Sequence, residues 1–395
     1  MSRTELKVLI VGGGIGGLTA ALCLAQDGHK VHVFEQMPDF QAIGAGIQLS
    51  PNASRVLHDL GLQEPLRAQA FLPQATQFRQ WRSGSVIAES PLGTVARERF
   101  GAPYYHIHRG DLLQLLVAAA HQQGNIELHT GACVTGVTQD DAGVSLQIGD
   151  IQHAGDMLVG ADGIHSVIRA ALWGDEHPRF TGHVAWRALV PTERLPPALI
   201  RPMSTVWWGP GKHFVHYYVR RGEFVNCVCV VEKPGWSLES WTQAGDLAEL
   251  KADFVGWHGD IQLLIDQAAP DSLYKWALYD RAPMTRWGQG RVSLLGDACH
   301  PTLPFMAQGA AMAIEDAAVL AGSLAKSGDI TDCLQHYETL RRPRTAHVQK
   351  GSRRNATTFH LSGPSAWLRD RAAGIAGQRV MDGLYSYDAL TAADE

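Results

Sequence analysis

The chain begins with two apolar runs that flank a glycine-rich turn and a stretch with helical spacing. Residues 7–11 are mostly branched aliphatic residues, as in a buried strand. After Gly17, apolar residues recur as on a packed helix, which should end at Asp27 and Gly28. Residues 29–34 then predict a second strand. The pattern therefore predicts a βαβ unit with the glycines at the turn between the first strand and the helix.

The glycines of this turn have the spacing found in dinucleotide-binding proteins. Gly12 permits a tight turn, Gly14 leaves room for a pyrophosphate beside backbone amides, and Gly17 lets the helix pack closely on the strand. Glu35 follows the second strand, where a carboxylate can accept both hydroxyls of a ribose. The pattern predicts a dinucleotide but suits NAD and FAD equally well. An ordinary glycine-rich turn is the weaker alternative, because both strands and the acid lie where the motif requires them.

Two later segments, residues 157–163 and 291–297, are short apolar strands that break where an aspartate adjoins a glycine. After the second of them and a loop with prolines, a long apolar helix begins near Gly309 and Ala310. The amides of a helix start can stabilise a group that becomes anionic, as the pyrimidine edge of a flavin does on reduction. Asp297 lies close to this helix start and could accept a ribityl hydroxyl.

Residues 180–280 differ in character, because they are rich in aromatic residues and in short alternating runs that predict a sheet. Residues 204–208 and 213–219 should form a hairpin. Strand alternation places His213 and Tyr217 on one face, next to valines. Two titratable rings there suit a pocket that orients a small phenol and takes its proton. Ordinary aromatic packing on a half-solvated sheet is the alternative.

The order and spacing of these motifs resemble the single-component FAD-dependent aromatic hydroxylases, the family of 4-hydroxybenzoate and salicylate hydroxylases. The glycine fingerprint, Asp162-Gly163 and the run from Gly296 to Gly309 carry the match, which covers roughly residues 5–350. The resemblance implies an α/β fold in which a Rossmann-like FAD-binding domain contains an inserted, mainly antiparallel β-sheet substrate domain. The implied parts are residues 1–72, 100–179 and 282–350 for FAD, residues 73–99 and 180–281 for substrate, and residues 351–395 as a C-terminal helical segment and tail.

The resemblance also implies roles for single residues. Gln48 and Pro304 should line the substrate side of the flavin. Only one glycine fingerprint is present, so NADH or NADPH should bind transiently as a co-substrate. From local sequence alone, Arg109 is equally well a surface arginine at a helix start. The residues expected to bind FAD are Gly12, Gly14, Gly17, Glu35, Arg109, Asp162, Asp297, Gly309 and Ala310.

The implied activity is hydroxylation of a phenolic aromatic carboxylate, using NAD(P)H and O2. Reduced flavin and O2 form a C4a-hydroperoxide that an electron-rich ring attacks, and a base that removes the phenolic proton raises the rate. His213 is the first candidate for this base and Tyr217 the second. A salicylate-type reaction, with or without loss of CO2, is the first hypothesis. The alternative is pyridine hydroxylation of the 6-hydroxynicotinate 3-monooxygenase type, from whose pattern Gln48 and Ser204 depart. A flavin-binding protein without catalysis is a more distant alternative.

Composition narrows the classes of partner. The net charge of -5 gives no basic field for nucleic acid. No signal peptide and no run of about 20 apolar residues is evident, so we expect a cytoplasmic protein with no membrane partner. The six cysteines show neither a C-x-x-C motif nor metal-like pairing with histidine, which predicts free thiols and no metal site. A monomer or a homodimer is expected.

The C-terminal part contains the only notable basic clusters, residues 341–344 and 353–354. We expect them on the solvated side of a helix, with a weaker possibility that Arg344 braces the flavin domain. The segment from Gly351 should be helical at first and frayed after about Ala389. It could cap the pocket or pair with another subunit.

Overall fold

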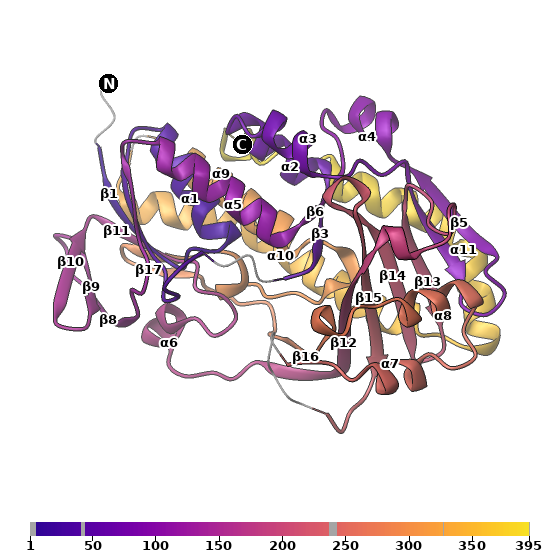
Figure 1. Ribbon diagram of the computed structural model, residues 1–395. Coiled ribbons are helices and arrows are strands. Elements are labelled where there is room, and N and C mark those ends of the chain that lie inside the picture. Colours follow the sequence, from indigo (N-terminus) through magenta and orange to yellow (C-terminus); the bar gives the residue numbers. More distant parts are fainter. Residues whose placement is uncertain (1–4, 41–43, 237–242, 327, 395) are drawn as a thin grey trace.

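The computed structural model describes residues 5–40, 44–236, 243–326 and 328–394. These residues form two lobes, each built on one large sheet (Figure 1). The first sheet has the order β17-β18-β11-β1-β2-β7, and the second has the order β16-β12-β15-β14-β13-β4-β5. The predicted α/β fold with a large antiparallel insertion is therefore confirmed.

The first lobe contains the predicted βαβ unit. β1 pairs in parallel with both β2 and β11, and α1 connects β1 to β2. The helix is buried along most of its length and packs against α9 and α5. The elements around this sheet are β1 (Lys7–Val11), α1 (Ile15–Gln26), β2 (Lys30–Phe34), α5 (Arg109–Gln122), β7 (Ile126–His129), β11 (Met157–Gly160), β17 (Gly288–Gln289), β18 (Val292–Leu294) and α9 (Gly309–Ala325).

Smaller elements complete this lobe. A two-stranded sheet, β3 with β6, lies between the lobes, and a three-stranded sheet, β10-β9-β8, projects at the far end (Figure 1). Their bounds are β3 (Gly46–Leu49), α2 (Pro51–Asp59), α3 (Gln63–Gln69), β6 (Tyr105–His108), β8 (Val134–Gln139), β9 (Val144–Ile148), β10 (Ile151–Gly155) and α6 (Val167–Trp173).

The second lobe confirms the predicted hairpin and its alternation. Phe214 packs edge-on against Phe254 under α7 and α8, so this face of the sheet is covered by helices. His213 and Tyr217 point to the opposite face, into a cavity. The elements are β4 (Ala75–Gln80), β5 (Val86–Pro91), α4 (Gly93–Phe100), β12 (Arg179–Pro191), β13 (Ser204–Gly209), β14 (Lys212–Val219), β15 (Phe224–Glu232), α7 (Leu247–Asp253), α8 (Gly259–Asp266) and β16 (Tyr274–Asp280).

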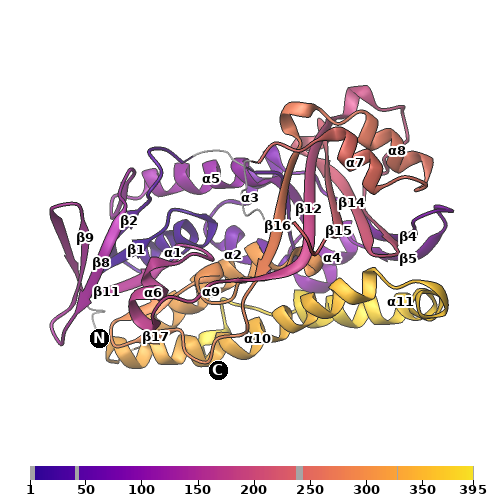
Figure 2. The ribbon, with the colours of Figure 1, turned by 90° about the horizontal axis from the view of Figure 1, so that it is seen from below.

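Two long helices, α10 (Ile330–Phe359) and α11 (Gly363–Tyr385), run along one side of both lobes (Figure 2). α11 packs on β5 and supplies part of the cavity wall. The sequence predicts a boundary between the FAD-binding domain and the C-terminal segment after residue 350. α10 continues across this position without a break, so one helix connects the two proposed segments. Among the described helices, none combines the length and the apolar character needed to cross a bilayer.

The structure corrects two predictions about the C-terminal part. Arg341 is completely buried rather than solvated, and Arg344 is largely buried, because both pair with the buried acid Glu315. Residues 390–394 are not frayed. Ala392 and Ala393 are buried in a short 3-10 helix that contacts α9 and α10.

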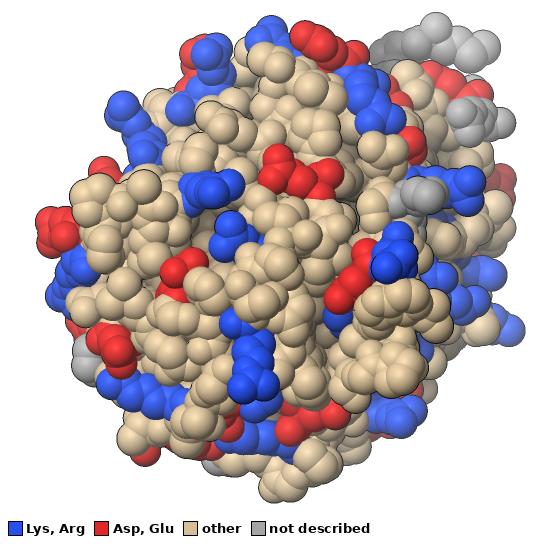
Figure 3. Space-filling view, turned by 90° about the vertical axis from the view of Figure 1, so that its right-hand side faces the viewer, with Lys and Arg blue, Asp and Glu red and all other residues tan. Residues whose placement is uncertain are grey.

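Charge is mixed on the face that Figure 3 shows, at the end of the molecule formed by the second lobe. Blue and red side chains are interspersed there, and no continuous patch of one sign is visible. All six cysteines are free thiols, as predicted.

Candidate active site

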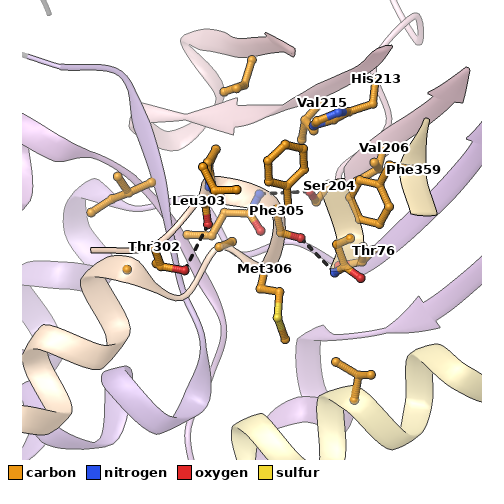
Figure 4. A pocket seen from close by; sticks show the side chains of 18 of the residues that line it. Thr76, Ser204, Val206, His213, Val215, Thr302, Leu303, Phe305, Met306 and Phe359 are labelled. Carbon is orange, nitrogen blue, oxygen red and sulfur yellow. Dashed lines mark hydrogen bonds between the residues drawn. The ribbon is translucent and has the colours of Figure 1, made fainter. Parts of the chain in front are cut away.

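A cavity of about 730 Å³ lies where the two lobes meet. The sheet of the second lobe forms one wall with His213, Val215 and Tyr217, and α11 closes another side. The loop 301–307 forms a third wall, so that Phe305 lies opposite His213 and Val215 (Figure 4). Asp297, Gly309 and Ala310 line the end of the cavity that belongs to the first lobe.

The glycine turn has the geometry that its sequence predicts. Gly12 has a φ of +104°, and a Cβ there would lie 2.4 Å from the carbonyl oxygen of Ala161. A Cβ on Gly17 would lie 2.0 Å from the carbonyl oxygen of Gly12, which explains the close contact of helix and strand. Gly14 is different, because a Cβ there would meet no atom within 4 Å. The space beside Gly14, at the start of α1, is therefore open for a ligand phosphate.

Two carboxylates flank this region. Glu35 accepts hydrogen bonds from the backbone amides of Gly13 at 2.8 Å and Met37 at 2.9 Å, which fixes its position at the end of β2. Each of its oxygens keeps a further lone pair for a ribose hydroxyl. Asp297 lies deep in the molecule but faces the open cavity, and burial raises the pKa of its carboxyl group.

Arg109 and Asp162 lie outside the cavity wall. Burial lowers the pKa of the Arg109 guanidinium, while the charges of Asp297 and Glu35 act in the opposite direction. Arg109 is thus close enough for the charges of both carboxylates, which the sequence assigns to opposite halves of FAD, to act on it. Asp162 accepts a hydrogen bond from the amide of Ile168, at 3.1 Å, in the loop that faces Gly12.

These features fit FAD. An open phosphate site at Gly14 and an acid at each end, Glu35 and Asp297, suit a dinucleotide, and the start of α9 lies in the cavity wall where an anionic flavin edge would be stabilised. The individual contacts to FAD are our proposals.

Gly14→Val tests this assignment, because the structure has room for the side chain until a phosphate arrives. Gly14 has φ -76° and ψ -176°, an extended conformation that valine adopts readily. We expect a folded protein without bound flavin, measured by circular dichroism and by the flavin absorbance of the purified protein. Gly17→Val is the contrasting variant and should fail to fold. Stoichiometric FAD in folded Gly14→Val would contradict the phosphate assignment.

All four residues that the sequence predicts on the substrate side line this one cavity: His213, Tyr217, Gln48 and Pro304. Gln48 is the centre of a polar cluster, because its amide oxygen accepts a 2.6 Å hydrogen bond from the hydroxyl of Tyr104 and its amide nitrogen lies 3.3 Å from Ser204 Oγ. It also interacts with the hydroxyl of Tyr217. The amide of Gln48 is thus held in one orientation in the part of the cavity next to His213 and Tyr217, which we call the chamber.

Burial has opposite consequences for the two candidate bases. It lowers the pKa of His213 well below its usual value, an effect that His360 and His183 reinforce. It raises the pKa of Tyr217 far above its usual value. At neutral pH, His213 is therefore a neutral imidazole that can accept a proton, whereas Tyr217 is a protonated hydrogen-bond donor.

Sequence reasoning missed three residues of this site. Arg187 and Tyr104 line the cavity, and His360 contacts His213. Alternation along β12 places Arg187 opposite to the buried Trp186, a signal that could have been used. No local pattern indicates His360, because its contact with His213 spans 147 residues.

Comparison with known proteins identifies the family of the chain. Residues 5–352 match the family described as FAD binding domain. The chain is 41% identical to 3-amino-4-hydroxybenzoate 2-monooxygenase PtnB3 of Streptomyces platensis, over 98% of each chain. It is 38% identical to 6-hydroxynicotinate 3-monooxygenase of Bordetella bronchiseptica, over 88% of this chain and 91% of that enzyme. It is also 38% identical to 3-hydroxybenzoate 6-hydroxylase of Polaromonas naphthalenivorans, over 96% and 95%.

Solved structures show the same fold. HpxO of Klebsiella pneumoniae, complexed with FAD and uric acid, superposes with a TM-score of 0.85 at 28% identity and covers 99% of this chain and 98% of its own. A salicylate hydroxylase in complex with substrate gives 0.84 at 26% identity, with coverage of 100% and 98%. The chain belongs to the FAD-binding-domain family of aromatic hydroxylases. It is an FAD-dependent aromatic monooxygenase.

Proposed function

We propose that this enzyme uses NAD(P)H and O2 to hydroxylate a phenolic aromatic carboxylate, and that His213 accepts the phenolic proton. The observation that supports this most strongly is the buried, neutral imidazole of His213 on the wall of a cavity that also contains Asp297 and the start of α9. Bound FAD, once reduced, supplies an activated oxygen atom for transfer to an electron-rich ring. The protein must orient that ring, exclude water and remove the proton.

Removal of the phenolic proton explains the division of roles in the chamber. A phenolate ring is more electron-rich than a phenol ring, so a proton acceptor within hydrogen-bond reach raises the rate. Tyr217 keeps its own proton and can donate a hydrogen bond to the substrate oxygen. Gln48, fixed by Tyr104 and Ser204, orients the opposite edge of the ring.

We assign Arg187 to the substrate carboxylate. Arg187 lines the cavity, and its guanidinium stacks over Trp276, with 4.4 Å between the guanidinium carbon and the ring centre. Burial lowers its pKa to about 10, so it stays charged at neutral pH. Stacking fixes the plane of the guanidinium, which suits bidentate binding of a carboxylate.

Four aromatic acids are candidates for the substrate within this class. Salicylate, hydroxylated with or without loss of CO2, is the prediction from the sequence. The names of the relatives at 41% and 38% identity favour an acid of the 3-amino-4-hydroxybenzoate or 3-hydroxybenzoate kind, and a hydroxynicotinate is the pyridine alternative. The cytoplasmic location, a role in aromatic catabolism, and the state of monomer or homodimer stay predictions.

The decisive experiment is oxygen uptake by the FAD-loaded enzyme with a panel of acids, using NADH and NADPH in turn. The panel comprises salicylate, 3-hydroxybenzoate, 3-amino-4-hydroxybenzoate and 6-hydroxynicotinate, each paired with the same ring lacking its carboxylate. We expect one acid to accelerate NAD(P)H oxidation and to gain one oxygen atom by mass. Its partner without the carboxylate should bind about 10- to 100-fold more weakly, because a charge-assisted hydrogen bond is lost.

Two results would contradict the proposal. If no phenolic acid stimulates NAD(P)H oxidation although the protein is saturated with FAD, the enzyme acts on a different class of ring. If the acid and its partner without the carboxylate bind equally well, Arg187 has a different role.

A further inference from the structure

A chain of hydrogen-bonded groups leads out of the cavity from His213. The Nδ1 of His213 lies 2.9 Å from the Nε2 of His360, and the Nδ1 of His360 lies 2.8 Å from a carboxylate oxygen of Glu232. Both histidines are buried, whereas about half of the Glu232 side chain is exposed. This series of hydrogen bonds therefore begins at the chamber and ends at solvent.

The exit is a second hollow on the far side of His360. Its wall includes Glu232, His360, His183 and polar groups of Thr181, Ser362 and Ser365. The two histidines of the chain belong to different parts of the sequence, β14 and the residue that ends α10, and Glu232 ends β15. Three separate elements thus place three titratable groups within hydrogen-bond distance of one another in succession.

The other charged or titratable groups near this line come from β12 and α11. The ring of His183 lies 5.5 Å from that of His360, but its Nδ1 is directed at the carbonyl oxygen of Thr181. Arg369 of α11 lies near enough to act on His360 electrostatically, and it forms an ion pair with Asp370. Neither His183 nor Arg369 interrupts the path from His213 to Glu232.

We propose that His213, His360 and Glu232 form a proton relay that connects the substrate chamber to solvent. The inference rests on the proposed function, because it requires a substrate with an ionisable hydroxyl. His213 is the residue that meets the substrate. His360 and Glu232 act through it and do not touch the reacting atoms.

The hydrogen bonds define the resting protonation states. If His360 Nδ1–H donates to Glu232, the Nε2 of His360 is an acceptor, and His213 Nδ1–H donates to it. The Nε2 of His213 is then an unprotonated acceptor for the chamber. This is the tautomer that a proton-accepting residue needs.

Transfer then requires three linked steps. The substrate O–H bond breaks as its proton binds His213 Nε2, the proton on His213 Nδ1 moves to His360 Nε2, and the proton on His360 Nδ1 moves to the carboxylate of Glu232. One proton leaves the substrate, one reaches Glu232, and neither ring keeps an extra proton. The reverse shift returns a proton to the product oxygen and restores both tautomers.

This arrangement removes a difficulty that burial creates. A buried imidazolium at His213 would be poorly stabilised, because the groups packed against it are the neutral rings of Phe305, Phe359 and His360. When the positive charge is passed on in the same event, it never has to stay on His213. A lone histidine in this position would be a weak base, and the relay avoids a lasting positive charge on its buried ring.

The relay can be tested with a bound nitrophenol, because nitrophenolates absorb visible light that neutral nitrophenols do not. We would titrate FAD-loaded wild type, His360→Gln and Glu232→Gln with 4-hydroxy-3-nitrobenzoate and record the pH at which the bound ligand ionises. We expect this pH to rise by about 1 to 2 units in His360→Gln and by a smaller amount in Glu232→Gln. His183→Gln is the matched control, since it removes a histidine from the same hollow but outside the relay, and should shift the ionisation far less than His360→Gln.

Steady-state rates supply the second measurement. The hydroxylation rate with the natural phenolic acid should fall about 10-fold or more in His360→Gln, whereas a nitro-substituted acid that already binds as a phenolate should lose little. An equal loss with both acids would indicate a structural role and overturn the relay.

Unchanged ionisation of the nitrophenol in Glu232→Gln and His360→Gln would also overturn it. Because Glu232 is half exposed, Glu232→Gln should fold even if His360→Gln does not. The titration of Glu232→Gln is then sufficient to test the relay. A wild-type enzyme that hydroxylates no phenolic acid would instead refute the proposed function.

Discussion

His213→Ala should lower the rate of hydroxylation by about 10²- to 10⁴-fold while the enzyme keeps its FAD. The imidazole lies on the cavity wall formed by the second lobe, whereas the glycine turn and Glu35 lie in the other lobe, so the substitution leaves the proposed flavin contacts intact. Because burial holds the pKa of His213 well below 6.5, the wild-type enzyme should keep its base in the active, neutral form down to pH values below the usual histidine range. Single-turnover oxidation of the reduced enzyme, followed by product analysis, measures the effect.

The same strand provides the matched control. His216 is also buried, but it lies on the opposite face of the sheet and accepts a 3.0 Å hydrogen bond from the indole of Trp207. His216→Ala should lower stability, because the indole loses its acceptor, yet each folded, FAD-loaded molecule should turn over as the wild type does. Near-normal hydroxylation by His213→Ala would remove this residue from the mechanism and leave Tyr217 as the candidate that has to be tested.

Patterns confined to a few residues predicted much of this molecule. The spacing of glycines predicted the turn at Gly12 and Gly17. Gly12 has a positive φ in the turn itself, and a Cβ on Gly17 would meet the carbonyl oxygen of Gly12, so both requirements arise within the βαβ unit. Alternation predicted that His213 and Tyr217 share a face, because a strand has a fixed period of two. The functional contacts of these residues with FAD and substrate stay predictions.

Features that depend on distant partners were missed. The basic run around Arg341 resembles a solvated helix face, and only the fold shows that Glu315 and Asp316 of α9 oppose it. A signal was present in α9, where two adjacent acids interrupt an apolar helix and require buried cations or hydrogen-bond donors. The His213–His360 contact carries no comparable signal, because each residue looks like an ordinary histidine in its own segment.

Arg341, Glu315 and Asp316 form a buried ionic cluster. Arg341→Met should break this cluster and lower the free energy of unfolding by about 3–5 kcal/mol. Arg341 is completely buried and bonds both acids of α9, with 2.7 Å from its Nη2 to Glu315 and 2.7 Å from its Nε to Asp316. Removing the guanidinium leaves two buried carboxylates with fewer partners. Chemical denaturation of the FAD-loaded enzyme measures the loss.

The neighbouring Arg342 supplies the control. It is partly exposed and pairs with Glu338 one helical turn away, so Arg342→Met should cost less than about 1 kcal/mol. Equal losses in the two variants would show that the buried cluster is no more important than a surface pair.

The cluster also connects stability to flavin binding. Asp316 accepts a hydrogen bond from the amide of Gly296 at 3.0 Å and pairs with His300 at 2.5 Å, so it holds both ends of the turn that presents Asp297 to the cavity. Arg341→Met should therefore weaken FAD retention, measured as a raised dissociation constant for FAD, although Arg341 does not line the cavity. Unchanged FAD affinity in the destabilised variant would separate the cluster from the flavin site.

The pH dependence of stability follows from the same contacts. Burial alone would raise the pKa of Asp316, but His300 and Arg341 reverse this effect and lower it to about 2. A carboxyl group whose pKa is lower in the folded than in the unfolded state contributes stability above its unfolded pKa of about 4, and loses it as the pH falls toward 2. Without Arg341 the folded pKa of Asp316 should rise, so acid unfolding of Arg341→Met should begin at a higher pH than in the wild type. An acid transition at the same pH in both proteins would mean that His300 and the Gly296 amide suffice to keep Asp316 ionised.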